Sequence, residues 1–181
     1  MRLAPRPKPA ALKSEQIILF RVGGALFAIS SASVQEVKSV DSLAGAAAEI
    51  KNSGIKKVRH ALERDDQTLF VVNGTMHFSL PLTPGTLVFI LYETRTALLI
   101  DRIEKMTSMT HLQALPSAFS GPERLWYRGL TALDQTVVPV VSPDGFLTAD
   151  ELFLLDAAVA EKSALQNAAA NALTPQGEPA K

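Results

Sequence analysis

The chain has 181 residues, a length typical of one domain or of two small lobes that share a core. Its 18 basic and 18 acidic side chains balance, which argues against nucleic-acid binding, because phosphate contacts need an excess of Lys and Arg. The absence of cysteine excludes disulfides, thiolate nucleophiles and Cys-ligated metal clusters. Apolar residues make up 47% of the chain, so we expect a sizeable core.

The first segment, residues 1–14, is predicted to be a disordered basic tail, since it has no acid and three prolines that oppose a helix. A weak electrostatic contact with an anionic membrane or partner is its alternative role. The strongly apolar run at residues 87–92 is too short to cross a bilayer, which takes about 20 helical residues. We therefore expect no direct membrane insertion and a cytoplasmic protein.

Short β-rich runs separated by turn residues follow along the body. Gly23-Gly24, Asn73-Gly74 and Asp134-Gln135 each separate two such runs, which predicts three hairpins, and residues 93–95 are predicted to be a turn between two further strands. Pro139 predicts an edge position or a bulge in its strand. The expected strands are residues 17–22, 25–29, 68–72, 75–80, 86–92, 96–100, 127–133 and 136–141.

Two segments are predicted to be helical. The serines at residues 30–33 can cap a short helix in which Val34, Val37 and Val40 form one apolar edge, with Val34 and Val37 in the core. Thr148 and Glu151 form a capping box before a C-terminal helix whose apolar face begins at Leu152. Leu155 and Val159 continue that face. Residues 156–181 are expected to be an Ala-rich helical extension that ends in a disordered tail. Residues 41–58 and 107–124 are expected to be irregular.

These elements predict a mainly β fold. The order of hairpin and irregular segment occurs twice, which indicates two small β-lobes at about residues 15–82 and 83–147. Neither lobe can bury much alone, so we expect a shared hydrophobic core, completed by the start of the C-terminal helix.

The sequence contains no motif that assigns catalytic, cofactor-binding or metal-ligating residues. The three histidines, His60, His77 and His111, have no metal-ligand spacing, and His77 is expected on a strand face. The acids at residues 63–66 lack the pattern of a calcium loop and are expected in a solvated turn. No phosphate loop and no nucleophile elbow is present. A binding or interaction module is favoured; a small hydrolase with a scattered site is the alternative.

The order of the apolar runs resembles the CheW-like domain of bacterial chemotaxis adaptors over residues 16–155. Residues 17–29 are similar to the first hairpin of that family, and residues 32–37 to its V-x-E-V segment. Residues 97–103 resemble its valine–aspartate–x–valine stretch, and residues 127–141 its closing hairpin. The middle segment departs from the family: Arg64 matches the family's arginine only at a shifted distance from the next strand, and Asp65 replaces the glycine that follows.

The resemblance implies SH3-like five-stranded β-barrel lobes and a non-enzymatic adaptor without a cofactor. The implied partners are the regulatory domain of a CheA-type histidine kinase and the cytoplasmic tip of a methyl-accepting chemoreceptor, whose helix would enter the groove between lobes. Another two-component or type IV pilus pathway, or a role as a competing accessory subunit, is the alternative. The interface candidates are Glu36, Arg64, Gln35 and Lys38; a solvated helix face is the competing interpretation of Glu36.

Overall fold

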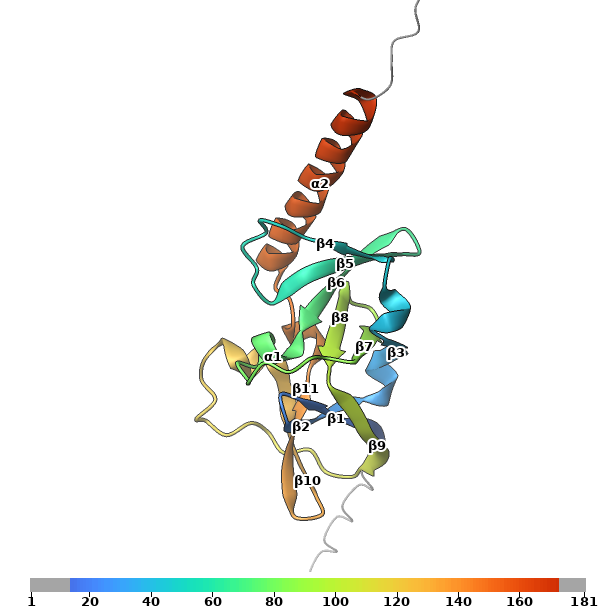
Figure 1. The fold of residues 1–181 in the computed structure, drawn as a ribbon. Coiled ribbons are helices and arrows are strands. Elements are labelled where there is room, and N and C mark those ends of the chain that lie inside the picture. The colour runs from blue at the N-terminus through green and yellow to red at the C-terminus, as the bar shows by residue number, and fades with distance from the viewer. Residues whose placement is uncertain (1–13, 173–181) are drawn as a thin grey trace, which may run out of the picture.

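The computed structural model describes residues 14–172, which form two β-sheets and one long helix (Figure 1). The tails expected at residues 1–13 and 173–181 lie outside the described residues. The strands are β1 (Glu15–Val22), β2 (Ala25–Ser30), β3 (Val34–Ser39), β4 (Ala47–Glu49), β5 (Val58–Arg64), β6 (Gln67–Asn73), β7 (Leu87–Leu91), β8 (Thr96–Ile100), β9 (Arg102–Met109), β10 (Tyr127–Leu133) and β11 (Thr136–Val141). The helices are α1 (Gly74–His77) and α2 (Ala149–Ala172).

The strands form a five-stranded sheet A, in the order β10-β11-β2-β1-β9, and a six-stranded sheet B, in the order β3-β7-β8-β6-β5-β4. The expected mainly β, two-lobed class is confirmed. The sheets are not closed five-stranded barrels, and each takes strands from both sides of residue 82, so they do not follow the expected lobe boundary. The reason is long-range pairing across residue 82: β6 with β8 and β11 with β2 are parallel, and β1 with β9 and β3 with β7 are antiparallel.

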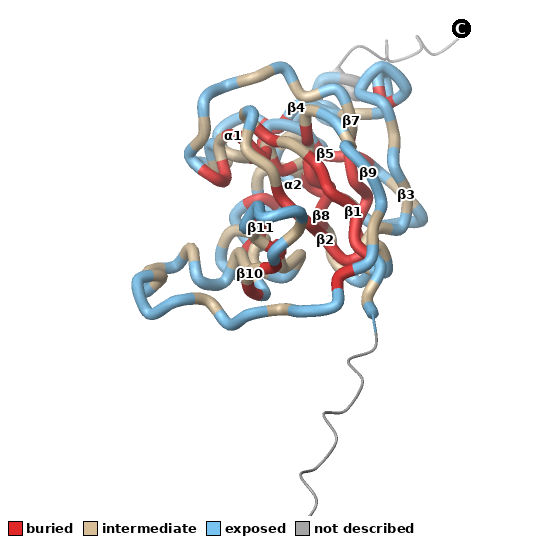
Figure 2. Tube along the Cα trace, turned by 90° about the horizontal axis from the view of Figure 1, so that it is seen from below, coloured by how far each residue is buried: buried red, intermediate tan, exposed pale blue. Residues whose placement is uncertain are grey.

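The expected shared core lies between the two sheets. Phe20 of β1 and Phe89 of β7 meet there edge to face, with ring centroids 5.3 Å apart. The opposite face of each sheet buries a smaller cluster, and Figure 2 shows these buried strands crossing the middle of the molecule. Strands buried on both faces explain why the sequence shows continuous apolar runs instead of alternation. The sheet B cluster consists of Leu43, Leu62, Leu69, Val88, Ile90 and Ala97.

The hairpins β1–β2, β7–β8 and β10–β11 form as expected. Gly23 and Gly24 both adopt positive φ in the first turn, which glycine does at no steric cost. The edge position predicted from Pro139 is wrong, because β11 lies between β10 and β2. Its ladder with β2 is only one residue pair long, and the bulge between β10 and β11 falls beside Tyr127. Because this ladder is so short, the absence of an N–H group on Pro139 costs it few hydrogen bonds.

The helix predicted after residue 30 is a strand. A short 3₁₀ turn spans Ser31–Ser33, and β3 then pairs antiparallel with β7. Val34 packs against the shared core, whereas Val37 is exposed, so placing both valines in the core is wrong. β-branched residues favour strands, and the partner strand overrides the helical spacing.

The hairpin predicted at Asn73-Gly74 is also wrong, because Gly74 begins α1. The side chain of Asn73 caps this helix by accepting a hydrogen bond from the Met76 N–H at 3.2 Å. β6 and β8 run parallel, so the chain after Asn73 must cross over instead of turning back. Gly74 fits the junction of the sheets, since a Cβ there would lie 2.7 Å from the Leu99 carbonyl oxygen.

The capping box at the start of α2 is confirmed. The Glu151 N–H donates to Thr148 Oγ1 at 3.2 Å, and the Thr148 N–H donates to Glu151 Oε2 at 2.9 Å. Leu155 is fully buried in the shared core, with Leu152 and Val159 partly buried beside it. The helix continues through the Ala-rich segment, and Figure 1 shows its second half extending beyond sheet B.

The two segments expected to be irregular contain more order than predicted. A 3₁₀ turn at Asp41–Leu43 precedes β4, and β5 was not predicted at all. Strand β9 runs on to Met109, and Gln113 then exchanges two backbone hydrogen bonds with Leu130 of β10. These pairings depend on strands far away in the sequence, which local patterns do not reveal.

Candidate functional site

Glu36, Arg64 and Lys38 form one charged cluster, although β3 and β5 are separated in sheet B by three other strands. Arg64 Nη1 donates to Glu36 Oε2 at 2.7 Å, across 28 positions in the sequence, and Lys38 Nζ lies 3.5 Å from Glu36 Oε1. Such a contact requires sheet B to curl until β3 faces β5. The structure thus brings together three of the four interface candidates.

This charged cluster lies on the same face of sheet B as the smaller core cluster of that sheet. Glu36 lies opposite Ile90 in the register, and Arg64 is two residues from Leu62 on the same strand. The side chains of Glu36 and Arg64 are therefore on the same face of the sheet as Ile90 and Leu62. The hydrogen bond that Arg64 donates to Glu36 raises the pKa of the guanidinium and keeps it charged. About a third of each side chain is exposed, at 30% for Arg64 and 38% for Glu36, so water screens the pair. The pair therefore contributes little to stability.

The turn between β5 and β6 holds Asp65 and Asp66 at positive φ, 49° and 61°. Aspartate tolerates this left-handed region better than most residues, which explains how it replaces the glycine of the CheW-like pattern. The expected solvated turn is correct for these two acids, whereas Glu63 lies in β5 and accepts a hydrogen bond from Thr68. Within residues 14–172, no group of three or more His, Asp or Glu side chains is placed to hold a metal ion.

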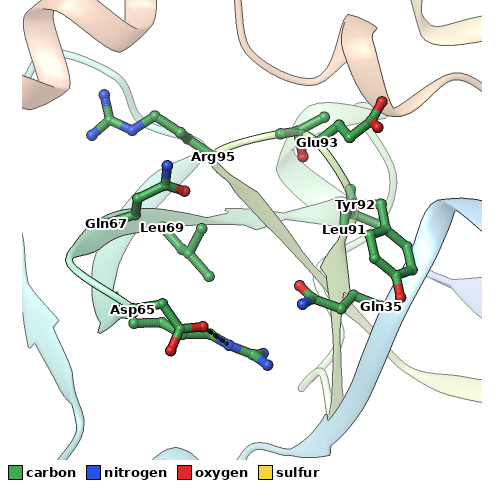
Figure 3. A pocket seen from close by; sticks show the side chains of 10 residues that line it. Gln35, Asp65, Gln67, Leu69, Leu91, Tyr92, Glu93 and Arg95 are labelled. Carbon is green, nitrogen blue, oxygen red and sulfur yellow. Dashed lines mark hydrogen bonds and ion pairs between the residues drawn. The ribbon is translucent and has the colours of Figure 1, made fainter.

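The fourth candidate, Gln35, lines a hollow of about 310 Å³ beside the charged cluster; we call it the Arg64 hollow. Figure 3 shows Gln35 and Tyr92 on one side of it and Gln67 and Leu69 on the other. The hollow opens over β3, the β5–β6 turn and the β7–β8 turn. Its lining residues are Gln35, Arg64, Asp65, Gln67, Leu69, Leu91, Tyr92, Glu93, Thr94 and Arg95.

A second hollow of about 480 Å³ shares Tyr92 and Glu93 with the first; we call it the Ser30 hollow. It lies between the sheets, because Ser30 and Arg128 belong to sheet A and the β7–β8 turn belongs to sheet B. Arg128 is held there by two hydrogen bonds to the Glu15 carboxylate, at 2.6 and 3.1 Å. These bonds lower the pKa of Glu15. The linings of the two hollows meet at Tyr92 and Glu93, and we refer to the pair of hollows as the groove.

Arg95 links the Arg64 hollow to helix α2, and nothing in the sequence indicated it. Its guanidinium donates to both carboxylate oxygens of Asp156, at 2.8 and 2.6 Å, and its Nε donates to the Thr68 carbonyl at 3.1 Å. The bidentate contact raises the pKa of Arg95 and lowers that of Asp156. The two residues are 61 positions apart, so no local motif could have joined them.

His77 is buried in α1 instead of lying on a strand face. Its ring packs 4.4 Å from Trp126 and 5.2 Å from Phe146, centroid to centroid. Neither ring nitrogen has a hydrogen-bond partner in the described part of the chain. Burial, with a smaller effect of Lys57, lowers the pKa of His77 to about 3, so the imidazole is neutral at physiological pH. His60 and His111 are exposed.

The helices between residues 14 and 172 lack the combination of length and apolar character that crossing a membrane requires.

Comparison with known proteins shows a likeness in structure but none in sequence. No protein-family model matches the chain, and no curated protein matches it. The solved structure of the scaffolding protein TtCheW from Thermoanaerobacter tengcongensis is similar, with a TM-score of 0.61 over 72% of this chain and 90% of that chain. The sequences are only 10% identical, so the likeness concerns the fold alone. The chain therefore has the two-lobed β fold of a CheW scaffolding protein.

Proposed function

We propose that this protein is a non-enzymatic adaptor that couples a methyl-accepting chemoreceptor to a CheA-type histidine kinase. The single observation that carries the proposal is the contact between Glu36 and Arg64. The resemblance to the CheW-like family selected both residues as interface candidates, and in the folded chain they form one cluster beside a groove. The likeness of the fold to a CheW scaffolding protein supports the same assignment.

The groove suits a docked helix. Tyr92 stands between the two hollows with half of its surface exposed, and tyrosine often anchors protein interfaces because it offers a large contact area and a polar end. Leu69 and Leu91 form an apolar floor in the Arg64 hollow. A receptor helix would place apolar side chains against this floor, while Gln35, Lys38 and the Glu36–Arg64 pair form a polar rim that sets specificity.

The test uses Glu36→Gln, which removes the charge but keeps the size of the side chain. A reversal to arginine would add a third cation beside Arg64 and Lys38 and would disturb stability as well. We expect Glu36→Gln to weaken binding to the kinase regulatory domain or to the receptor tip about tenfold, because Arg64 loses the partner that orients it. The melting temperature should fall by at most about 3 °C, since screened pairs contribute about 1 kcal/mol or less.

Glu49→Gln on β4 is the matched control, because Glu49 is an exposed sheet B glutamate whose carboxylate pairs, among residues 14–172, only with Lys51. It should bind both partners as the wild type does. Isothermal titration calorimetry measures the binding, and differential scanning calorimetry measures the stability. If the wild type binds neither partner, the proposed function is wrong; a large fall in melting temperature for Glu36→Gln would show that Glu36 is structural instead.

A further inference from the structure

The Arg64 hollow is lined by neutral polar groups that have no hydrogen-bond partner within residues 14–172. The carboxamides of Gln35, on β3, and Gln67, at the start of β6, form no hydrogen bonds with the rest of the described chain, and both side chains are exposed (Figure 3). Figure 3 shows them on opposite sides of the opening. Each carboxamide can donate and accept hydrogen bonds. The hydroxyl of Thr94 also lines the hollow, and it is buried without a partner in the described part of the chain. The hollow therefore offers three neutral polar groups to a bound molecule, the two carboxamides and this hydroxyl.

Both arginines that line the hollow are already paired with carboxylates. Arg64 is bound to Glu36 and to Asp65, and Arg95 is bound to both oxygens of Asp156. An incoming carboxylate would approach Asp65 and Glu93, and an incoming cation would approach the two arginines. Like charges brought together in a partly desolvated site oppose binding. The lining thus favours a neutral ligand group.

The apolar part of the lining narrows the choice of ligand group further. Leu69 and Leu91 are buried apolar residues beneath the opening, so a ligand group needs an apolar stem as well as a polar end. A helix satisfies its own backbone hydrogen bonds, which leaves only its side chains to bind the two glutamines. Asparagine and glutamine combine a hydrocarbon stem with a neutral group that both donates and accepts.

We propose that the Arg64 hollow recognises an asparagine or glutamine side chain of the docked helix, held between the carboxamides of Gln35 and Gln67. This inference rests on the proposed function, because it names the chemistry of the receptor segment that the groove takes. Gln35 and Gln67 then determine specificity, while Glu36 and Arg64 hold the rim in place.

The experiment titrates the full chain with the purified cytoplasmic hairpin of a methyl-accepting receptor from the same genome. Gln67→Leu should weaken binding about fivefold, and so should replacement of one asparagine or glutamine of the hairpin by leucine. When both are combined, the loss should stay near fivefold, because the two changes remove the same contact. Gln166→Leu, an exposed glutamine of α2 away from the hollow, is the control and should bind as the wild type does.

Two charged variants test the neutrality of the ligand. Gln67→Glu and Gln67→Lys should both weaken binding, whereas a carboxylate ligand would make the lysine variant bind more tightly and a cationic ligand the glutamate variant. Tighter binding of either variant overturns the inference and leaves the proposed function intact. The same holds if the loss from Gln67→Leu adds to the loss from the hairpin substitution for every asparagine and glutamine of the hairpin. A wild-type chain that does not bind the hairpin overturns both proposals.

Discussion

Glu36 and His77 show at the residue scale how exposure decides what a titratable side chain does. Glu36 is partly open to water and lies against Lys38 and Arg64, so both the solvent and these two cations stabilise its charge. His77 is closed off by Phe78, Trp126 and Phe146, and no polar group of residues 14–172 compensates its ring nitrogens. Burying an imidazolium there would cost free energy, so the ring stays neutral.

The buried imidazole makes stability depend on pH. The pKa of His77 falls from 6.5 to about 3 on folding, so between these values the unfolded chain binds a proton that the folded chain does not. The free energy of unfolding should therefore be unaffected by His77 above pH 6.5 and decrease as the pH falls below it, by up to about 1.4 kcal/mol per pH unit.

The measurement compares urea unfolding of the wild type and of His77→Leu between pH 7.5 and about pH 4.5. The leucine variant lacks the titrating group but keeps an apolar side chain, so the difference between the two free energies isolates His77 from the carboxylates that also titrate. Parallel pH profiles would contradict the prediction and would mean that the imidazole is solvated or hydrogen-bonded.

At the element scale, helix α2 consists of a fixed half and a projecting half. Its beginning is held to sheet B by ion pairs of Lys57 with Glu151 and of Arg95 with Asp156, and Leu155 enters the shared core. Lys162 makes a further contact, donating to the Glu49 carbonyl at 2.8 Å. Farther along, Leu165 is 66% exposed, so burial no longer stabilises the helix there and only the high helix propensity of alanine does.

Two leucines on this helix form a matched pair for a stability test. Leu155→Ala should lower the free energy of unfolding by about 2–5 kcal/mol, because it leaves a cavity in the core. Leu165→Ala should change it by less than about 0.5 kcal/mol, since the side chain is exposed. Chemical denaturation of both variants checks the prediction. A comparable loss for Leu165→Ala would mean that the projecting half packs against something in solution.

At the scale of the whole molecule, the two sheets depend on each other for their strands. Sheet A combines β1 and β2 with β9, β10 and β11, while sheet B combines β3 to β6 with β7 and β8. The shared core then joins Phe20 and Phe27 of sheet A to Phe70 and Phe89 of sheet B. The body therefore should fold as one unit.

A cut between residues 82 and 83 tests this unity. Each fragment would hold strands of both sheets but complete neither, so residues 14–82 and 83–172 should each lack dispersed amide signals in a ¹H–¹⁵N spectrum. Mixing the two fragments should restore the dispersion, because their strands complement each other. A fragment that folds alone and unfolds cooperatively would show that the lobes follow the sequence after all.

Local chemistry in the sequence was enough for the elements that depend on neighbours along the chain. The hairpins with short turns follow from their turn residues, and the start of α2 follows from the capping box of Thr148 and Glu151. The mainly β class and the shared core follow from many short apolar runs in a chain too small for two independent cores. The four interface candidates came from a resemblance to a family.

Only the tertiary structure decided the features that join distant segments. The valine spacing in residues 34–40 and the Asn73-Gly74 pair each fit two local structures, and pairing with β7 or crossing over toward β8 selected one of them. The contact of Arg64 with Glu36 needs a curled sheet, and that of Arg95 with Asp156 needs α2 to lie on sheet B. The sequence by itself determined which charged side chains, apolar runs and turn residues the chain contains. Long-range strand pairing determined which of them meet, because its free energy exceeds local preferences of a few tenths of a kcal/mol to about 1 kcal/mol per residue.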